Sequence, residues 1–526
     1  MEENKVVQKR EDKIKKWFSV KYNLALTLIL IVAFAIRFYF YLQTQNQPLW
    51  WDESEYMSAA KSFAGIGQYH LSTIRLPGFP LMAAAFFFLG IQSEPVIRFF
   101  LLFLPSIILI FLTYRIMSEM YSDKRIALIS TAILSVLWES LFYSNRFHTE
   151  NISLIFEFLA IFILFKCYMK KENAWFIKPK FALPVIALFI AACILIRPGN
   201  IIFIPALLAF IPILNYKFIV ERKKISYPIL IILLLGALFI LFNLKNIPII
   251  SVNYHPENPI VFKTLEVFYG FYQPALFIPG LLFYFFLFGI ILSLFYFWIK
   301  LPLIKNFSRN KDNLDFKSDI FNALLIISVL GSFIFLLRTP SFEFRWFFAF
   351  LPGMFAFTGI GLTKISDYFS KVTKSKGIVG FIFIVLFVVC LYGQFTFSKS
   401  IIENKKESYL EVKEAGLWLK ENSNNDDVVI TSSVPQISYY SERKVYDFTF
   451  NSLISNFQEN VTAFNQEILK SKPRYLILSA FEPVFTPKWA YSWPNETNSV
   501  ISKAYFQNNN QKQPILIIYE LKYEGS

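Results

Sequence analysis

The sequence predicts a polytopic α-helical membrane protein of about eleven transmembrane helices, followed by a small C-terminal extracytoplasmic α/β domain. The first observation is composition: 55% of the 526 residues are hydrophobic, 62 of them Phe, and the mean hydropathy is +0.46. The second is a series of apolar runs long enough to cross about 30 Å of hydrocarbon. The third is a change to a polar composition after residue 397. A soluble protein of this length would not carry so many long apolar runs.

The basic and cysteine residues exclude several other classes of protein. The formal charge of +15 lies mostly in short patches between the apolar runs. Such patches are typical of cytoplasmic loops under the positive-inside rule, so they do not require a nucleic-acid partner. Cys167, Cys193 and Cys390 all lie within apolar segments, which excludes a disulfide framework and a zinc ribbon.

The apolar runs locate the expected transmembrane helices. They are predicted at residues 22–42, 97–118, 126–143, 150–169, 181–196, 200–214, 227–243, 279–299, 319–337, 346–363 and 377–397. With residues 1–21 taken as a basic cytoplasmic N-terminus, the loops predicted inside hold far more Lys and Arg than those predicted outside. This arrangement predicts a multi-pass protein of the plasma membrane, with a transmembrane module at 22–397 and an extracytoplasmic domain at 398–526.

One apolar run is too short to span. "LPGFPLMAAAFFFLG", residues 76–90, opens with Pro77 and Pro80. Counting it as a crossing would move the basic stretch "SDKR" at 122–125 to the outside. We therefore expect a helix that lies in the outer interface. Residues 43–96 then form one large outer loop.

The C-terminal segment alternates between helical and strand-like patterns. A helical pattern at 408–421 is followed by "DVVITSS", a second helical stretch, "KVYDFTF", a helix near 452–471, "RYLILSA" and "PILIIYELK". Strands that alternate with helices predict a small α/β domain. It contains no glycine-rich phosphate loop.

Three carboxylates open the outer loop: Asp52, Glu53 and Glu55. Asp52 as the N-cap and Glu55 at N3 would make a capping box for a helix that runs to about Ala64. A capping aspartate is also a rigidly held carboxylate, which suits a general base. Both interpretations stay open at this level.

A second polar cluster, "YSNRFHTENIS" at 143–153, falls at another predicted outer loop. It brings together Arg146, His148 and Glu150, which form either a solvated turn or a second part of a site. His148 and Glu150 are also candidates for a divalent metal site, although no HxxxH or HExxH spacing is present.

Arginines predicted on the outer side form a third set. They are Arg75, Arg197, Arg338 and Arg345. Snorkelling towards lipid headgroups is one explanation. The other is a bidentate clamp for a lipid-borne phosphate, because the guanidinium fork matches phosphate oxygens. A long aromatic loop at 253–277, which includes His255 and Tyr272, would contact an acceptor or cover the site, and Arg146 is a candidate for the same role.

In the order and spacing of these segments, the chain resembles the GT-C membrane glycosyltransferases. The likeness is to the branch of the protein O-mannosyltransferases (dolichyl-phosphate-mannose-protein mannosyltransferases) and aminoarabinose transferases. The matching stretches are "WWDESEY", "RLPGFPLMAAAFFFLG", "YSNRFHTENISLIFEFLAIFILF", "LIRPGNIIFIPALL" and "FEFRWFFAFLPGMFAFTGIGL". They lie within about residues 20 to 400.

The resemblance implies an inverting glycosyltransferase of the cell envelope that uses a polyprenyl-phosphate sugar on the extracytoplasmic face. It implies Asp52 as the general base, with Glu53 beside it. Glu150 would place the acceptor or a metal. Arg345, together with Arg75, Arg197 or Arg338, would stabilise the departing lipid phosphate. The acceptor would be a protein, a lipid or a glycan, and the sugar a hexose or pentose.

Two other classes of function remain as alternatives. A lipid or solute transporter would place ionisable residues near the bilayer midplane and would show two related halves of broken helices. Glu157 is the one acid predicted to lie deep in the bundle. A non-catalytic assembly or receptor protein would have no need for acids in two separate outer loops.

Overall fold

A computed structural model describes most of the chain. The described residues are Trp17, 19–67, Tyr69, 75–214, 280–300, 314–336, 344–450, 460–497, 500–506 and 514–523. They form two compact units. The helical unit takes the described residues of 1–41, 102–144 and 149–402, and the loop–sheet unit takes those of 42–101, 145–148 and 403–526.

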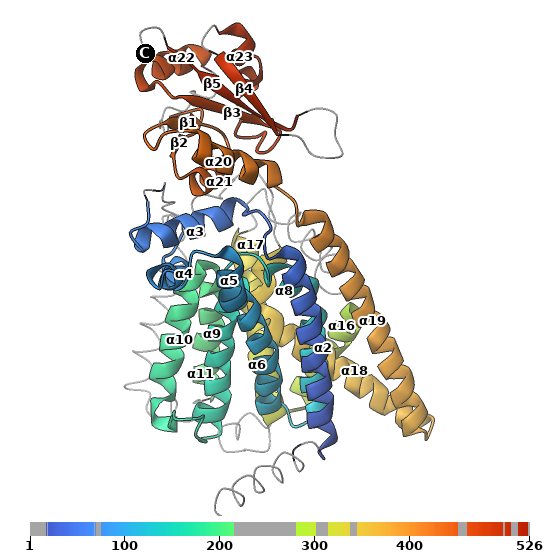
Figure 1. Cartoon of the computed structure of the whole chain (residues 1–526). Helices are drawn as coiled ribbons and strands as arrows, with labels where there is room; N and C mark the ends of the chain where they lie inside the picture. The colour runs from blue at the N-terminus through green and yellow to red at the C-terminus, as the bar shows by residue number, and fades with distance from the viewer. Residues whose placement is uncertain are drawn as a thin grey trace, which may run out of the picture. The chain divides into compact units, whose positions relative to one another are not determined.

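The helical unit is a bundle of long apolar helices (Figure 1). Its helices are α2 (Lys21–Thr44), α6 (Leu104–Met120), α7 (Lys124–Val136), α8 (Trp138–Tyr143), α9 (Glu150–Ile163), α10 (Ala182–Ile196), α11 (Phe203–Leu214), α16 (Gly280–Lys300), α17 (Leu314–Leu336), α18 (Leu351–Val372) and α19 (Lys376–Lys405). π-Helical turns at Phe99–Phe103 and Leu164–Met169, and 3₁₀ turns at Pro179–Phe181, Pro198–Ile202 and Phe344–Phe350, adjoin them. The core is a continuous apolar cluster that includes Leu109, Phe158, Phe162 and Phe355.

Within the described residues, seven helical stretches are long and apolar enough to cross a membrane. They are Lys21–Thr44, Glu94–Met120, Glu150–Met169, Pro179–Ile196, Gly280–Ile299, Phe348–Val372 and Lys376–Asn422. The chain is therefore a membrane protein with a largely helical fold, as predicted. The expected helix at 227–243 lies outside the described residues, and the total of eleven crossings stays a prediction.

A break divides the helix that the sequence predicts as one span at 126–143. The chain leaves the helical conformation at Leu137, between α7 and α8. Side chains of α2 and α19 satisfy the backbone groups that the break frees. Arg37 donates to the carbonyls of Leu134 (3.0 Å) and Ser135 (2.6 Å), Ser398 donates to Val136 O (3.4 Å), and Gln394 accepts from Trp138 N–H (3.3 Å). Because hydrocarbon offers no hydrogen bonds, an interrupted helix needs such partners.

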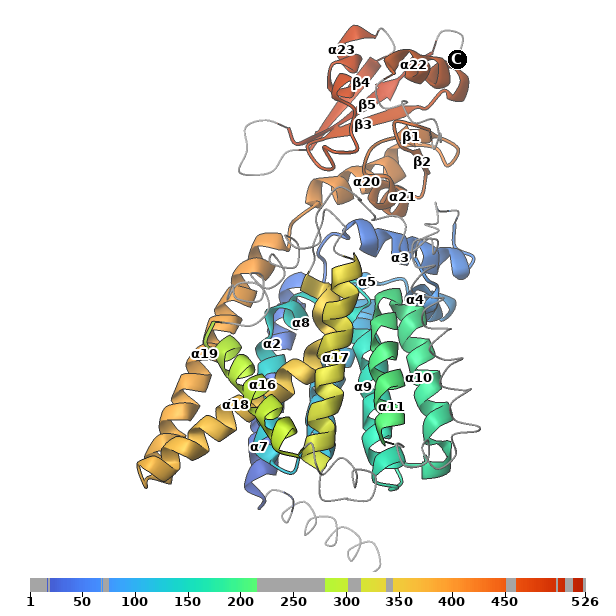
Figure 2. The same cartoon turned by 180° about the vertical axis from the view of Figure 1, so that it is seen from behind.

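The crossing of α16 and α18 is made by two glycines, in helices that lie against one another in Figure 2. A Cβ added to Gly361 would lie 2.0 Å from the carbonyl oxygen of Phe285, and a Cβ added to Gly289 would lie 1.8 Å from that of Phe357. Small residues at a helix crossing let the two backbones approach closely, which is a main source of packing energy in membranes.

The loop–sheet unit joins the first long loop to the C-terminal domain. Its helices are α3 (Trp51–Phe63), α4 (Gly78–Phe88), α5 (Glu94–Arg98), α20 (Leu410–Asn422), α21 (Val434–Ser441), α22 (Val461–Ser471) and α23 (Trp493–Glu496). Its strands are β1 (Val428–Ile430), β2 (Lys444–Tyr446), β3 (Tyr475–Ser479), β4 (Val500–Phe506) and β5 (Leu516–Leu521). A short 3₁₀ turn occupies Lys488–Tyr491. The strand order is β2-β1-β3-β5-β4.

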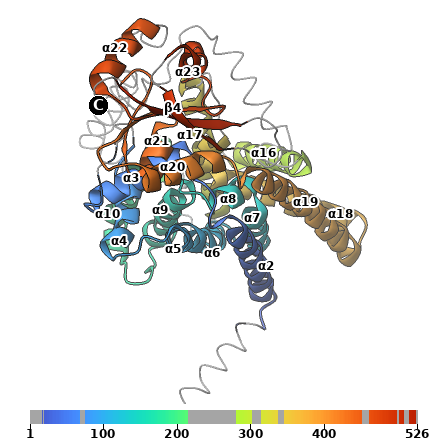
Figure 3. The same ribbon diagram turned by 45° about the horizontal axis from the view of Figure 1, so that its top comes forward.

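Both faces of the sheet are covered. β1 pairs in parallel with β2 and β3, whereas β5 pairs antiparallel with β3 and β4. Along β3, Tyr475 and Ile477 pack in the apolar cluster that contains residues of α20, and Leu476 and Leu478 pack in the cluster that contains residues of α22. This alternation follows from the two-residue period of a strand. Figure 3 shows α20 and α21 side by side, and α21 also packs on α3.

The predicted elements agree with the structure except in details. The short helix expected within 76–90 is present as α4. The strands predicted from "RYLILSA" and "PILIIYELK" are β3 and β5. β4 was not predicted, because Ser502 and Lys503 interrupt its apolar pattern and the strand lies at the edge of the sheet.

We expect Gly361→Ala to loosen the α16–α18 crossing, because even a methyl group would overlap the Phe285 carbonyl. Overpacking of this kind costs about 1–3 kcal/mol. Thermal unfolding of the purified protein in detergent measures the loss. Gly393→Ala, at a glycine of α19 with nothing within 4 Å of an added Cβ, is the matched control. Equal melting temperatures for the two variants would contradict the close crossing.

Candidate functional site

α3 begins two residues earlier than the capping-box prediction requires. The N-cap is Trp50, not Asp52, and Glu53 occupies N3. The Glu53 Oε2 atom accepts a hydrogen bond from the Trp50 N–H at 2.7 Å, as an N3 glutamate does in a capping box. The prediction of Asp52 and Glu55 as the capping pair was therefore wrong. Asp52 is the second residue of the first helical turn.

Glu53 is a fully buried anion enclosed by positive groups. Arg146 Nη1 donates to its Oε2 at 3.1 Å, the Phe147 N–H donates to its Oε1 at 2.7 Å, and Arg98 Nη1 lies 3.9 Å from Oε1. Burial raises the pKa of Glu53. The charges of Arg146, Arg98 and His148 and the Trp50 hydrogen bond outweigh burial, so the pKa lies below its usual value. Glu53 is therefore a structural carboxylate with no free oxygen for a substrate.

The two arginines on Glu53 extend the cluster into neighbouring segments. Arg98 donates to the carbonyls of Asn145 (2.5 Å) and Gln47 (3.0 Å). Arg146 donates to the Lys405 carbonyl (2.9 Å), and its guanidinium lies 3.7 Å from the centre of the Trp50 ring. We call Glu53, Arg98 and Arg146 the buried triad. It ties the start of α3, the end of α5, residues 145–147 and the last residue of α19 into one structure.

Asp52 and Glu55 share one arginine, Arg75. Arg75 donates from Nη2 to Asp52 Oδ1 and from Nε to Glu55 Oε2 at 2.6 Å. Trp51 Nε1 also donates to Glu55, at 3.1 Å. Burial lowers the pKa of Arg75, but Asp52, Tyr56 and Glu55 outweigh it and raise the pKa above the ordinary value. The predicted role of Arg75 at a lipid phosphate is thus in competition with these two carboxylates.

Accessibility separates the three acids of α3. The side chain of Asp52 is 20% exposed, that of Glu55 is 13% exposed, and that of Glu53 is not exposed at all. Asp52 is therefore the most exposed of the three acids. It also stands on a helix whose start is fixed by the buried triad, which gives it a defined position.

The C-terminal domain holds the segment that leads into α3. The Leu49 N–H donates to the Tyr440 hydroxyl at 2.9 Å. Lys61, near the end of α3, pairs with Glu442 at 3.2 Å and lies 4.3 Å from the centre of the Tyr439 ring. These contacts from α21 and its C-cap hold both ends of α3.

Glu150 forms a separate cluster in the helical unit. Its Oε1 atom lies 3.4 Å from Arg197 Nη1 and 3.6 Å from Arg345 Nη1. Arg197 Nη2 also donates to the Arg345 carbonyl at 2.8 Å. Glu150 begins α9, Arg197 ends α10 and Arg345 lies in the turn before α18. Two guanidinium groups therefore converge on a single carboxylate at the ends of three helices.

A buried carboxylate lies deeper in the same unit. Glu157, two turns along α9 from Glu150, is fully buried, and neither of its oxygens has a hydrogen-bond partner in the described part of the chain. Glu139 of α8 is in the same situation within the described residues. The positive charge of Arg197 interacts electrostatically with the Glu157 carboxylate.

The structure thus groups the predicted residues into two sets. Asp52, Glu53, Arg75, Arg146 and His148 belong to the loop–sheet unit, and Glu150, Arg197 and Arg345 belong to the helical unit. Arg338, His255 and Tyr272 lie outside the described residues.

The described residues offer no set of ligands for the predicted metal site. Among the described residues, no group of three or more His, Cys, Asp or Glu side chains could hold a metal ion. Glu53, which His148 influences, already accepts hydrogen bonds on both oxygens, and Glu150 faces two guanidinium groups.

Sequence reasoning missed Arg98 and Tyr440. Arg98 falls at the junction of the outer loop and an apolar run, where a basic residue is disfavoured on the predicted outer side, and that was an available signal. Tyr440 carries no such signal, because its contact with Leu49 spans 391 positions of the sequence.

Comparison with known proteins places the fold. No protein-family model matches the chain, and no curated protein matches its sequence. Solved structures do match. One is the oligosaccharyltransferase AglB from Archaeoglobus fulgidus in complex with an inhibitory peptide and a dolichol-phosphate, at 13% identity and a TM-score of 0.57 over 88% of this chain and 70% of that one.

A second match is ArnT from Cupriavidus metallidurans bound to undecaprenyl phosphate. It is 9% identical, with a TM-score of 0.53 over 94% of this chain and 97% of that one. At such identities the likeness shows the fold alone. The chain therefore shares the fold of AglB and ArnT.

Proposed function

We propose that this protein is an inverting glycosyltransferase that moves a sugar from a polyprenyl-phosphate carrier to an acceptor on the extracytoplasmic face of the membrane. The observation that carries the proposal is the convergence of Arg197 and Arg345 on Glu150 in a chain with the GT-C fold. The two neighbours support the class of donor, since one was solved with a dolichol-phosphate and the other with undecaprenyl phosphate.

Arg197 and Arg345 have the properties required to bind a departing phosphate. Among the described residues, two guanidinium groups face one carboxylate, so these three side chains together carry a net positive charge. Guanidinium groups carry several donors in a planar fork that matches phosphate oxygens. Fixed positive charge of this kind stabilises the phosphate as it gains charge in the transition state. In this proposal Glu150 orients the arginines.

Asp52 is proposed as the general base. The acceptor hydroxyl oxygen forms a bond to the anomeric carbon of the sugar as its proton passes to the Asp52 carboxylate. The bond from the anomeric carbon to the phosphate oxygen breaks, and its electron pair leaves with the polyprenyl phosphate. A base placed within hydrogen-bond reach contributes about 10²–10⁴-fold to such a step. Glu53 is a positioning residue in this scheme, because its oxygens are occupied by the buried triad and backbone donors.

Arg146 acts with Glu53 as a positioning residue, and His148 adds positive charge near it. Arg75 orients Asp52 and Glu55 rather than binding the donor alone. Arg338, His255 and Tyr272 retain their proposed roles at the phosphate and the acceptor. The protein O-mannosyltransferase branch and a mannosyl donor are finer proposals of the same kind, as are the plasma-membrane location and the cytoplasmic N-terminus.

A lipid or solute transporter is the second candidate, and one observation favours it. Glu157, in a stretch long and apolar enough to cross a membrane, and Glu139, in the short helix α8, are buried without hydrogen-bond partners in the described residues. Buried carboxylates of this kind occur in proton-coupled carriers. The first assay separates the two functions. The purified protein in liposomes is offered a panel of undecaprenyl- and dolichyl-phosphate sugars with a cell extract as the source of acceptors. Release of free polyprenyl phosphate supports transfer, whereas flux of labelled lipid without release supports transport.

We expect Asp52→Asn to lower the rate of polyprenyl phosphate release at least a hundredfold, because the amide cannot accept the proton. Glu55→Gln is the matched control, since Glu55 shares Arg75 with Asp52. Its rate is expected to stay within about tenfold of wild type. Equal losses in both variants would show that the two acids act only by holding Arg75.

We expect Arg345→Gln to weaken binding of undecaprenyl phosphate. The loss of a hydrogen bond to a charged group costs about 1.5–3 kcal/mol, which corresponds to about 10–150-fold in affinity. Native mass spectrometry of the purified protein measures the affinity. Arg115→Gln, which removes an arginine paired with Glu119 on α6, is expected to bind as wild type. Unchanged affinity in Arg345→Gln would remove the arginine from the phosphate site.

We expect the buried triad to make stability depend on pH. The folded pKa of Glu53 is lowered, so its contribution is fully present above the unfolded value of 4.5 and is lost as the pH falls through the folded pKa. Glu53→Gln should melt at a lower temperature at pH 7, because breaking a buried pair costs about 3–5 kcal/mol. As the pH is lowered below 4.5, the melting temperature of Glu53→Gln should fall less than that of wild type.

Thermal unfolding followed by tryptophan fluorescence tests this pH dependence, with Glu421→Gln, an exposed acid of α20, as the control. Two results would contradict the role of the triad. One is a control that loses as much stability as Glu53→Gln. The other is a Glu53→Gln variant whose melting temperature varies with pH in parallel with that of wild type.

A further inference from the structure

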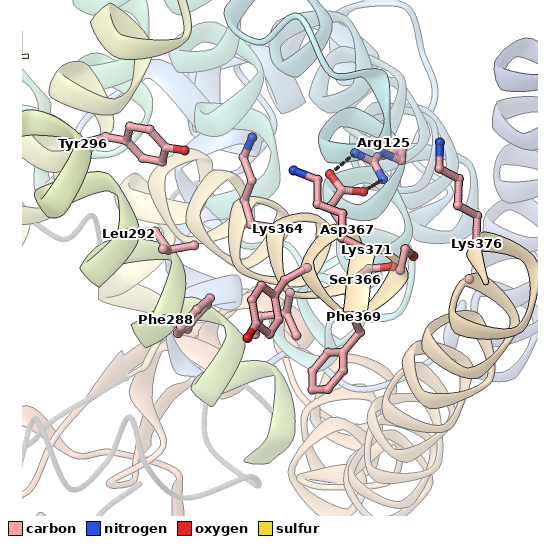
Figure 4. A pocket seen from close by; sticks show the side chains of 14 residues that line it. Arg125, Phe288, Leu292, Tyr296, Lys364, Ser366, Asp367, Phe369, Lys371 and Lys376 are labelled. Atoms are coloured by element: carbon pink, nitrogen blue, oxygen red, sulfur yellow. Dashed lines mark hydrogen bonds and ion pairs between the residues drawn. The ribbon is translucent and has the colours of Figure 1, made fainter. Parts of the chain in front are cut away.

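A cavity of about 920 Å³ lies in the helical unit, between α16, the end of α18 and the start of α19. Figure 4 shows it from close by. Arg125, at the start of α7, and Lys364, Asp367, Lys371 and Lys376 supply its charged side chains. Four cations thus face one carboxylate. Nothing in the proposed transfer reaction uses these residues.

The single lining carboxylate is already paired. Arg125 Nη1 and Nη2 donate to the two oxygens of Asp367 at 2.8 and 2.9 Å, and the same guanidinium also donates to Asp123. Lys364, Lys371 and Lys376 form no ion pair with any described residue. Three ammonium groups therefore remain available to an anion, and Lys371 and Lys364 lie close enough to act on Asp367.

Part of the remaining lining is apolar and exposed. Phe288 of α16 is 37% exposed and Phe369 of α18 is 47% exposed, and Leu292 lies between Phe288 and Tyr296 along α16. Both exposed phenyl groups belong to helices long and apolar enough to cross a membrane. An inorganic anion would use only the ammonium groups. An amphipathic ligand would use the ammonium groups and the phenyl groups together.

The cavity lies at the opposite end of the helical unit from Glu150. α7 begins at the cavity and leads through α8 to Glu150, and α18 runs from the turn that holds Arg345 to the cavity (Figures 1 and 2). The loops at this end include those predicted to be cytoplasmic from their basic residues. The cytoplasmic leaflet carries anionic lipids, and basic pockets between transmembrane helices on that side bind their headgroups.

We propose that this cavity binds the headgroup of an anionic glycerophospholipid. The phosphate lies on Lys364 and Lys371, Lys376 contributes at the edge, and an acyl chain runs along Phe288 and Phe369. The Arg125–Asp367 pair fixes the end of α18 to the start of α7 and so holds the two lysines of α18 in place. The site is independent of the proposed transfer reaction.

Native mass spectrometry of the full chain tests the site with dioleoyl phosphatidylglycerol as the probe and dioleoyl phosphatidylcholine as the neutral lipid. We expect one phosphatidylglycerol to bind preferentially. We expect Lys364→Gln with Lys371→Gln to weaken that binding roughly tenfold or more, because two charge-assisted contacts are lost. Lys178→Gln with Lys180→Gln, which removes two charges from exposed residues before α10, is the matched control and should bind as wild type. Size-exclusion chromatography verifies that each variant is folded.

Three results would overturn the proposal. The first is equal binding of the two lipids. The second is equal loss in the two double variants, which would mean general attraction to basic residues. The third is release of phosphatidylglycerol by millimolar inorganic phosphate, which would identify a site for a soluble anion. Retention of the lipid in phosphate, with loss only in the Lys364 and Lys371 variant, supports the lipid site.

Discussion

The geometry of the loop–sheet unit depends on one buried ionised carboxylate. Glu53 has no access to solvent, so its charge is tolerable only because Arg98, Arg146 and two backbone N–H groups surround it. Those partners come from distant parts of the sequence and are fixed in turn by carbonyls of residues 47, 145 and 405. The position of Asp52, one residue before Glu53 on the same helical turn, follows from this arrangement. The position of the partly exposed Asp52 is thus set by a buried neighbour.

In the helical unit, too, buried polar groups need hydrogen-bond partners, here among apolar helices. A break between α7 and α8 frees backbone groups, and Arg37, Gln394 and Ser398 satisfy them. The polar side chains cost little there because each meets a backbone partner. The break redirects the chain before the loop that carries Arg146 and Glu150. The two glycines of the α16–α18 crossing contribute in the opposite way, by removing side chains so that two backbones meet.

Long elements were predictable from the sequence, and pairwise contacts were not. Hydropathy located the described transmembrane helices closely, because about 20 consecutive apolar residues have few alternatives to a spanning helix. β3 and β5 were predicted from dense apolar runs, whereas the edge strand β4 was not. At the site, the sequence indicated Asp52, Glu150 and the arginines as candidate functional residues from their type and position. It did not show that Glu53 would be the N3 residue of the capping box and Glu55 a partner of Arg75, because helix starts shift by one or two residues with local packing.

The division of the chain between the two units has a consequence for biosynthesis. The loop–sheet unit is assembled from residues 42–101, 145–148 and 403–526, so α3 emerges from the ribosome long before the strands and α21 that complete its surroundings. Contacts such as Leu49 with Tyr440 cannot form until nearly the whole chain has been made. Such long-range closure is slow relative to local helix formation. The newly made protein therefore passes through a stage in which its first transmembrane helices have formed but residues 42–101 have not reached their final structure. The loop–sheet unit is completed only with the last quarter of the polypeptide.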